Sequence, residues 1–164
     1  MSKLIVIRGN SGTGKSTVAQ AIRKKCPTSD TMLVSQDMIR LEILNVKDSE
    51  DNKAIELIYN ICNYGKKNCK YVILEGILAK EKYQVMLRKL IEQFEEVDIF
   101  YLKAQFKTTV QRNNYRSIDR KFSVKTLKSW WLEDDFLGVQ REKIINSEGS
   151  LSDVVNHISQ DIGV

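Results

Sequence analysis

The sequence predicts an α/β fold in which a five-stranded, mainly parallel sheet is covered by helices on both faces. Short apolar runs rich in Val and Ile alternate along the 164-residue chain with longer segments of helical periodicity. Such runs are typical of strands buried on both faces, and strands that alternate with helices pair in parallel through right-handed crossovers. The length fits one domain, so we expect residues 1–164 to form a single unit.

The expected elements follow one another at regular spacing. We expect strands at Lys3–Arg8, Met32–Ser35, Tyr71–Glu75, Asp98–Leu102 and Lys143–Ile145. We expect helices at Lys15–Lys25, Asp37–Leu44, Asn52–Lys67, Lys80–Phe94, Phe106–Arg116, Val124–Asp134 and Leu151–Ile162. Pro27 follows the first helix, where helices commonly stop, and Ser150 with Asp153 forms a capping box for the last one. Trp130 and Trp131 are adjacent and point in different directions on a helix, so we expect one of them in the core.

The composition predicts a globular protein of a reducing compartment. The spacing of the three cysteines fits no zinc motif, so they are expected to be free thiols. No apolar run has the length of a signal-peptide core or a membrane span, and we expect a cytoplasmic protein with no membrane partner. A net charge of +5 is compatible with an anionic ligand, but the basic residues occur in short runs rather than in a dense nucleic-acid-binding stripe.

A glycine-rich turn joins the first strand to the first helix. Residues 9–16, GNSGTGKS, match the pattern G-x-x-x-x-G-K-[ST] in full. Glycines let such a loop curl so that its N–H groups point at phosphate oxygens, and the helix that follows adds its positive dipole end. We therefore predict a P-loop NTPase fold of three layers that binds ATP. The predicted nucleotide-binding residues are Gly9, Asn10, Ser11, Gly12, Thr13, Gly14, Lys15, Ser16, Thr17 and, from a later helix, Arg112.

Other P-loop classes fit less well than a small kinase. Lys15 is expected to reach the terminal phosphates as a catalytic residue, and the Ser16 hydroxyl to ligate Mg²⁺. A GTPase requires N-K-x-D, whereas residues 52–55 read NKAI, and the D-x-x-G letters at 135–138 come too late for a switch. A transport ATPase needs a much longer domain.

The acceptor side is predicted where the second and third strands end. Asp37 and Arg40 share a helix face if the segment is helical, and that face borders the ligand crevice of an open α/β sheet. Asp37 is expected to take the proton of an attacking hydroxyl and Arg40 to orient the acceptor. Alternatively, Asp37 caps the helix and Arg40 pairs with Glu42 or water. Glu75 ends the third strand, and three roles are open for it. It is expected to hold a Mg²⁺-bound water or to bind the acceptor, and the alternative is a structural role.

An arginine-rich segment follows the fourth strand. Arg112 and Arg116 are one helical turn apart, and Arg120 and Lys121 fall in the next loop. We predict a lid at about residues 112–124 that closes over the triphosphate, with Arg116 and Arg120 as catalytic residues. The alternative is a solvated helix face.

Taken in this order, the glycine loop, D-x-x-R, L-E-G and the arginine-rich segment resemble the small P-loop kinases. The stretches VILEGIL (72–78) and KSWW (128–131) are similar to the bacterial uridine kinase-like group, and chloramphenicol phosphotransferase-like proteins and polynucleotide 5′-kinase domains are related. The resemblance spans residues 4 to about 162. It implies ATP and Mg²⁺, an acceptor base at Asp37 with Arg40 beside it, and lid arginines at 112, 116 and 120.

The expected activity is transfer of the ATP γ-phosphate to a hydroxyl of a small molecule, nucleoside-like or antibiotic-like. One alternative is a polynucleotide 5′-hydroxyl kinase with a nucleic-acid partner, and another is a nucleotide-dependent binding module without metabolic turnover. The fuller pyrimidine-nucleoside pocket of true uridine kinases has no counterpart in the sequence.

Overall fold

The computed structural model describes all residues from 1 to 164, and its centre is a five-stranded sheet in the order β2-β3-β1-β4-β5. All four neighbouring pairs of strands are parallel. The predicted five-stranded sheet is therefore confirmed, and it is parallel throughout. The strands are β1 (Lys3–Gly9), β2 (Thr31–Ser35), β3 (Tyr71–Glu75), β4 (Glu96–Lys103) and β5 (Glu142–Asn146).

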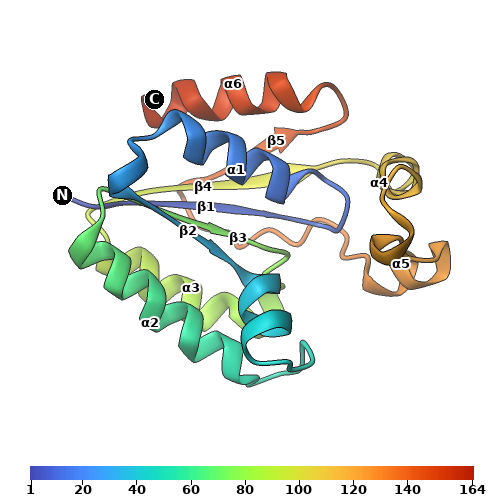
Figure 1. Ribbon diagram of the computed structural model, residues 1–164, viewed down its shortest axis with the longest axis horizontal. Coiled ribbons are helices and arrows are strands. Elements are labelled where there is room, and N and C mark those ends of the chain that lie inside the picture. Colours follow the sequence, from blue (N-terminus) through green and yellow to red (C-terminus); the bar gives the residue numbers. More distant parts are fainter.

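Helices cover both faces of the sheet and complete the three predicted layers. Helices α1 (Lys15–Lys25) and α6 (Leu151–Ile162) lie on one face, and α2 (Lys53–Asn68) and α3 (Lys80–Gln93) on the other (Figure 1). Because the strands are parallel, their carboxyl ends all lie at one end of the molecule. The short helices α4 (Phe106–Asn114) and α5 (Val124–Trp130) project there (Figure 1).

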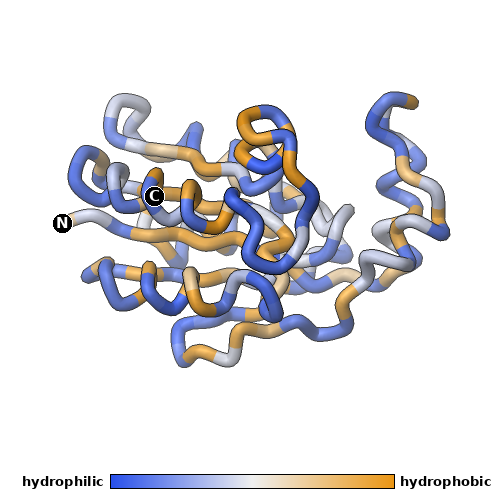
Figure 2. The backbone as a smooth tube through the Cα atoms, turned by 90° about the horizontal axis from the view of Figure 1, so that it is seen from below, coloured by the Kyte–Doolittle hydropathy of each residue, from blue (hydrophilic) through white to orange (hydrophobic).

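Alternate residues of the strands β1 to β4 enter two separate cores. In β1, Leu4 and Val6 pack in the α2/α3 layer, whereas Ile5 and Ile7 pack in the α1/α6 layer. All four side chains are buried, which explains why the strand lacks the polar alternation of a half-exposed sheet. In Figure 2 the apolar colour is concentrated along the strands, and the projecting α4–α5 end is largely hydrophilic.

The connecting helices differ from the sequence prediction near the carboxyl end of the sheet. The segment predicted as a helix over 37–44 forms a π-helical turn, η2 (Met38–Ile43). Helix α4 ends at Asn114, and a 3₁₀ turn, η3 (Ile118–Arg120), follows it. Helix α5 ends at Trp130 instead of Asp134. The prediction that one tryptophan is in the core is wrong, because Trp130 is exposed and Trp131 is only partly buried.

The early end of α5 follows from a buried arginine in β1. The side chain of Arg8 is fully buried and pairs with Asp135 at 3.0 Å and Glu142 at 3.1 Å. It also donates to the Leu78 carbonyl at 3.0 Å. An unpaired buried charge is costly. The chain after Trp130 must therefore return to the sheet so that Asp135 can pair with Arg8, and it cannot continue as a projecting helix.

The remaining sequence expectations concern the cysteines and membranes. Cys26, Cys62 and Cys69 are free thiols. None of the helices combines the length and the apolar composition that a bilayer span requires.

Candidate active site

The glycine loop lies between β1 and α1 and is closely packed from outside. Gly12 and Gly14 have φ angles of +83° and +99°, which side chains rarely adopt. A Cβ on Gly14 would come within 2.6 Å of Leu151 in α6, and a Cβ on Gly12 within 2.9 Å of Thr109 in α4. The pattern therefore needs glycine both for the curl of the loop and for contacts with α4 and α6. Such a curled loop at a helix N-terminus fits a polyphosphate.

Lys15 is buried at the start of α1, and its amine lies over the loop. Its Nζ donates a hydrogen bond to the Asn10 carbonyl at 2.7 Å. Burial lowers the pKa of Lys15 to about 8, while the carboxylates of Glu75 and Asp37 raise it and the guanidinium of Arg116 lowers it further. The fold therefore places Glu75, Asp37 and Arg116 close enough for their charges to act on Lys15. These four predicted site residues come from β3, the start of η2, the lid and α1.

Ser16 and Glu75 meet at the position predicted for the metal. The Ser16 hydroxyl donates to Glu75 Oε2 at 3.2 Å, and Glu75 is buried at the carboxyl end of β3. No cluster of three or more His, Cys, Asp or Glu side chains is present that could enclose a cation by itself. One hydroxyl and one carboxylate fit Mg²⁺, which keeps several waters and takes its other ligands from phosphates.

Asp37 and Arg40 do share one face, as the sequence predicts. Arg40 Nη2 lies 3.5 Å from Asp37 Oδ1, and Arg40 Nη1 donates to the Val46 carbonyl at 3.1 Å. The Asp37 side chain remains 71% exposed, whereas that of Arg40 is 18% exposed. Asp37 is therefore available to a hydroxyl in the crevice, while Arg40 is used mainly to fix η2 and Asp37.

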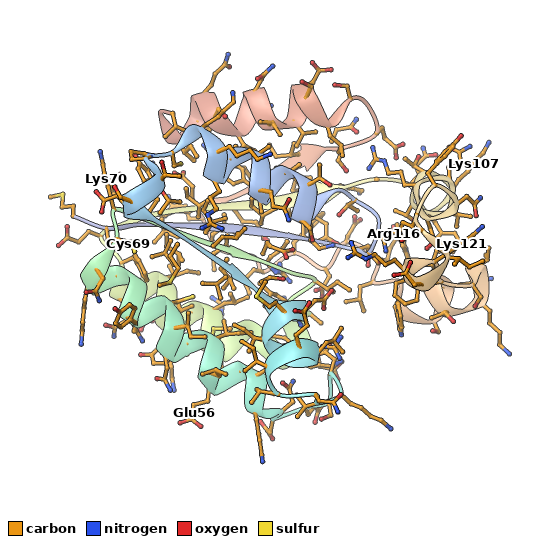
Figure 3. The ribbon with its side chains drawn as sticks, in the orientation of Figure 1. Glu56, Cys69, Lys70, Lys107, Arg116 and Lys121 are labelled. Carbon is orange, nitrogen blue, oxygen red and sulfur yellow. The ribbon has the colours of Figure 1, made fainter.

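The three predicted lid arginines have different surroundings. Arg112 donates to the carbonyls of Gly12 and Gly149, each at 3.3 Å, and also to that of Ser147, so it joins the glycine loop to the β5–α6 connection. Arg116 lies on the lid near the carboxyl end of β1 (Figure 3) and acts electrostatically on Lys15. Arg120 is exposed in η3 and is not among the charged groups that act on Lys15.

The side chain of Asn10 is bonded to the chain just after α5 and is not directed at the phosphate position. Its Nδ2 donates to the Leu132 carbonyl at 2.7 Å, and its Oδ1 accepts from the Leu132 N–H at 2.9 Å. We call this pair of hydrogen bonds the Asn10–Leu132 latch. The loop pattern predicts Asn10 only as a nucleotide-binding residue, and no local signal connects it with a residue 122 positions later.

Gln36 is a second residue that sequence reasoning missed. It is buried directly before Asp37, and its Oε1 accepts from the Leu78 N–H at 2.9 Å. Its side chain packs on Gly76, whose φ is +159°. The glycine in the L-E-G motif thus makes room for Gln36, which ties the ends of β2 and β3 together beneath the candidate acceptor site.

A sequence profile of the AAA domain family matches residues 4–130, from β1 to the end of α5. This match covers the glycine loop, Asp37, Glu75 and the arginine segment. The chain belongs to the AAA domain family. No curated protein matches the sequence.

Solved structures with the same fold as this AAA domain family member include several small kinases. The tunicamycin resistance protein of Deinococcus radiodurans is 17% identical over 100% of this chain and 97% of its own, with a TM-score of 0.71. The APS kinase CysC of Mycobacterium tuberculosis, solved with AMPPNP and APS, is 14% identical over 99% and 98%, with a TM-score of 0.70. A gluconokinase from Sinorhizobium meliloti 1021 is 16% identical over 98% and 95%, with a TM-score of 0.69. The fold is that of small P-loop kinases.

Proposed function

We propose that the protein transfers the γ-phosphate of ATP to a hydroxyl of a small molecule with the help of Mg²⁺. The observation that carries the proposal is the convergence of Lys15, Asp37, Glu75 and Arg116 at the ends of three neighbouring strands. A donor loop, a carboxylate pair and a lid cation are the parts that phosphoryl transfer requires. The family and the small-kinase fold support the same class of reaction.

Each residue has a separate task in this proposal. The loop amides and Lys15 bind the donor phosphates, and Ser16 and Glu75 would hold Mg²⁺ and its waters. Asp37 accepts the proton of the acceptor hydroxyl, for which its exposed carboxylate is suited. Arg116 supplies positive charge when the lid closes and excludes water. The bound Mg²⁺ would supply charge neutralisation between the phosphate groups.

The experiment is a γ-phosphate transfer screen across nucleosides, antibiotics, sugars and 5′-hydroxyl oligonucleotides. With an acceptor identified, Lys15→Ala is expected to lower turnover by about 100-fold or more, because a fixed cation near the transferred group is lost. Asp37→Asn is expected to lower it by about 100-fold while the ATP dissociation constant stays nearly unchanged. Asp30→Asn is the control, since Asp30 is exposed in η1 (Thr28–Asp30), at the opposite end of β2. Full activity in Asp37→Asn would overturn the assignment of the base.

A second candidate, the polynucleotide 5′-hydroxyl kinase, is favoured by the charge of the projecting α4–α5 region, which includes the lid. Residues 105–131 contain seven Lys and Arg but one acidic residue, Asp119, which gives +6; since the whole chain carries +5, the remainder carries −1. The same region also exposes aromatic rings, with Tyr115 92%, Trp130 44% and Phe122 38% exposed. Positive charge interleaved with exposed rings is typical of single-stranded nucleic-acid binding.

The same screen separates the candidates. An oligonucleotide acceptor predicts a rate that falls steeply with salt, and a matched loss in Lys121→Gln and Lys125→Gln. Of the two substituted residues, Lys121 is labelled in Figure 3, where it lies with Lys107 at the outer end of the molecule, away from the candidate metal ligands. A small-molecule acceptor predicts a weak salt dependence and no effect of these two substitutions. Slow ATP hydrolysis that no acceptor alters would instead indicate a nucleotide-dependent binding module.

A further inference from the structure

A cavity of about 540 Å³ lies at the carboxyl ends of β4 and β5, behind the glycine loop. Its walls come from the β4–α4 connection, the chain after α5 and the edge strand β5. Phe106 and Trp131 form one wall as an edge-to-face pair with centroids 5.3 Å apart. Ile144 of β5 also lines the cavity and is 53% exposed, an unusual position for a large apolar side chain on a sheet edge.

This edge cavity is separate from the candidate active site. Lys15, Ser16, Asp37, Glu75 and Arg116 do not line it. The shared residue is Asn10, and its side chain in the cavity wall is bonded to Leu132 rather than directed at the phosphate side of the loop. A ligand in the edge cavity therefore leaves the donor and acceptor positions free.

The charges around the edge cavity are predominantly negative, in contrast to the lid. Glu133, Asp134 and Glu148 line it, and Lys103 is the one cation in its lining. Lys103 is already paired with Asp134, with Nζ 2.6 Å from Oδ1. Glu133 forms no salt bridge, although its charge acts on Lys103. Its Oε2 accepts a hydrogen bond from Trp131 Nε1 at 2.8 Å, which fixes a carboxylate beside the indole ring. The lining thus carries three negative charges against one positive charge.

We propose that the edge cavity is a binding site for a small organic cation, an amine carried on an apolar or aromatic body. Its aromatic walls and Ile144 would cover the body, and the carboxylate of Glu133 beside the indole would bind the ammonium group. An anionic ligand of the same shape is disfavoured, because the lining carries three carboxylates against one lysine. The volume is in the range of ordinary small-molecule sites.

Binding here acts on the Asn10–Leu132 latch, because both latch residues belong to the cavity wall. A ligand that packs on Leu132 restrains the end of the lid and, through Asn10, the glycine loop. The edge cavity is therefore an effector site for nucleotide binding, a consequence that rests on the proposed function. Binding of the organic cation to the cavity does not depend on the proposed function.

The test uses three probes with one body and different head groups: 2-phenylethylammonium, 2-phenylethanol and phenylacetate. The readout is the NMR signal of the Trp131 indole N–H, assigned by comparison with Trp130→Phe. The ammonium probe is expected to shift this signal and to bind about tenfold tighter than the alcohol, while phenylacetate binds more weakly than both. Glu133→Gln, which keeps an acceptor for the indole, is expected to remove the preference for the ammonium probe.

Ile144→Lys is expected to abolish binding of the ammonium probe, because it places a cation in the wall. Val85→Lys makes the same change at an exposed site on α3, outside this cavity, and is expected to leave binding intact. Equal binding of the three probes, or no binding at all, would overturn the proposal. Displacement of the probe by MgATP would also overturn it, since the cavity would then belong to the nucleotide site. Simultaneous binding with an unchanged ATP dissociation constant would remove the effector role, whether or not phosphoryl transfer occurs.

Discussion

Asn10 holds a position that the glycine-loop pattern leaves variable, yet its side chain is fully engaged. Two hydrogen bonds fix it to the backbone of Leu132, just beyond α5. At the other end of the same segment, Arg112 is bonded to the Gly12 carbonyl. The segment 112–132, which contains the lid, is therefore attached at both ends to the loop that would hold the phosphates. A change in the loop on nucleotide binding has a direct physical route to the lid.

We expect Asn10→Ala to loosen the lid while leaving the rest of the fold intact. The substitution leaves the N–H and carbonyl of Leu132 without partners, at a cost of about 1–3 kcal/mol, and this favours local opening of the segment between Arg112 and Leu132. The segment offers trypsin exposed sites at Arg116, Arg120 and Lys121. The measurement is the rate of limited tryptic cleavage, with sites identified by mass spectrometry.

Cleavage within residues 112–131 is expected to accelerate about tenfold in Asn10→Ala, in proportion to the population of the open form. Asn10→Asp keeps the acceptor for the Leu132 N–H but loses the donor, so an intermediate rate is expected. Gln20→Ala, an exposed substitution on α1, serves as the control. Equal cleavage rates in all variants would show that the latch does not restrain the lid.

At the scale of elements, α2 shows how closely a helix is fitted to the sheet. Gly65 is buried in the last turn of α2 and has ordinary helical geometry. A Cβ there would lie 2.8 Å from Met32 Sδ in β2 and 2.8 Å from Val72 Cγ2 in β3. The glycine is therefore required by packing, although it lowers the helix propensity of α2 by about 1 kcal/mol relative to alanine.

We expect Gly65→Ala to destabilise the protein in spite of the gain in helix propensity. Met32 can adjust because it is flexible, but Val72 is fully buried in β3 and cannot move away. Overpacking of this kind costs about 1–3 kcal/mol, which outweighs the propensity term. The measurement is the free energy of urea unfolding. Gly149→Ala is the matched control, because its Cβ would enter open space, and an equally small change in both variants would contradict the packing argument.

At the scale of the whole molecule, the sequence was sufficient to predict those elements that a local residue pattern determines. The apolar runs predicted all five strands, and the GNSGTGKS loop predicted the junction of β1 and α1. Contacts that close the carboxyl end of the sheet could not be predicted in this way. Arg8 finds Asp135 and Glu142, and Asn10 finds Leu132, across more than 100 residues, and neither pairing follows from periodicity or spacing. The same contacts explain why α5 stops early.

The α2/α3 layer also has a distinctive response to alkaline pH, because it buries two weak acids. Burial raises the pKa of the Cys62 thiol from 9.0 to about 12. Burial, together with a hydrogen bond to the Asp48 carboxylate, raises the pKa of Tyr83 from 10.0 to about 12. Above pH 9 to 10 the unfolded chain releases these protons and the folded chain keeps them. The stability contributed by both groups is therefore complete below pH 9 and is lost as pH rises towards 12.

Cys62→Ala isolates one of these groups. The difference in unfolding free energy between the wild type and Cys62→Ala is expected to be constant from pH 7 to 8.5. It should then shrink above pH 9, with a limiting slope of about 1.4 kcal/mol per pH unit. Taking the difference at each pH cancels Lys15, whose lowered pKa acts in the opposite direction between about 8 and 10.5. Urea unfolding in reducing buffer at each pH gives the measurement. Tyr83→Phe should show the same trend, beginning one pH unit higher because its unfolded pKa is 10.0. A difference that stays flat to pH 10.5 would mean that Cys62 ionises in the folded protein as readily as in water, and that the layer does not exclude solvent from it.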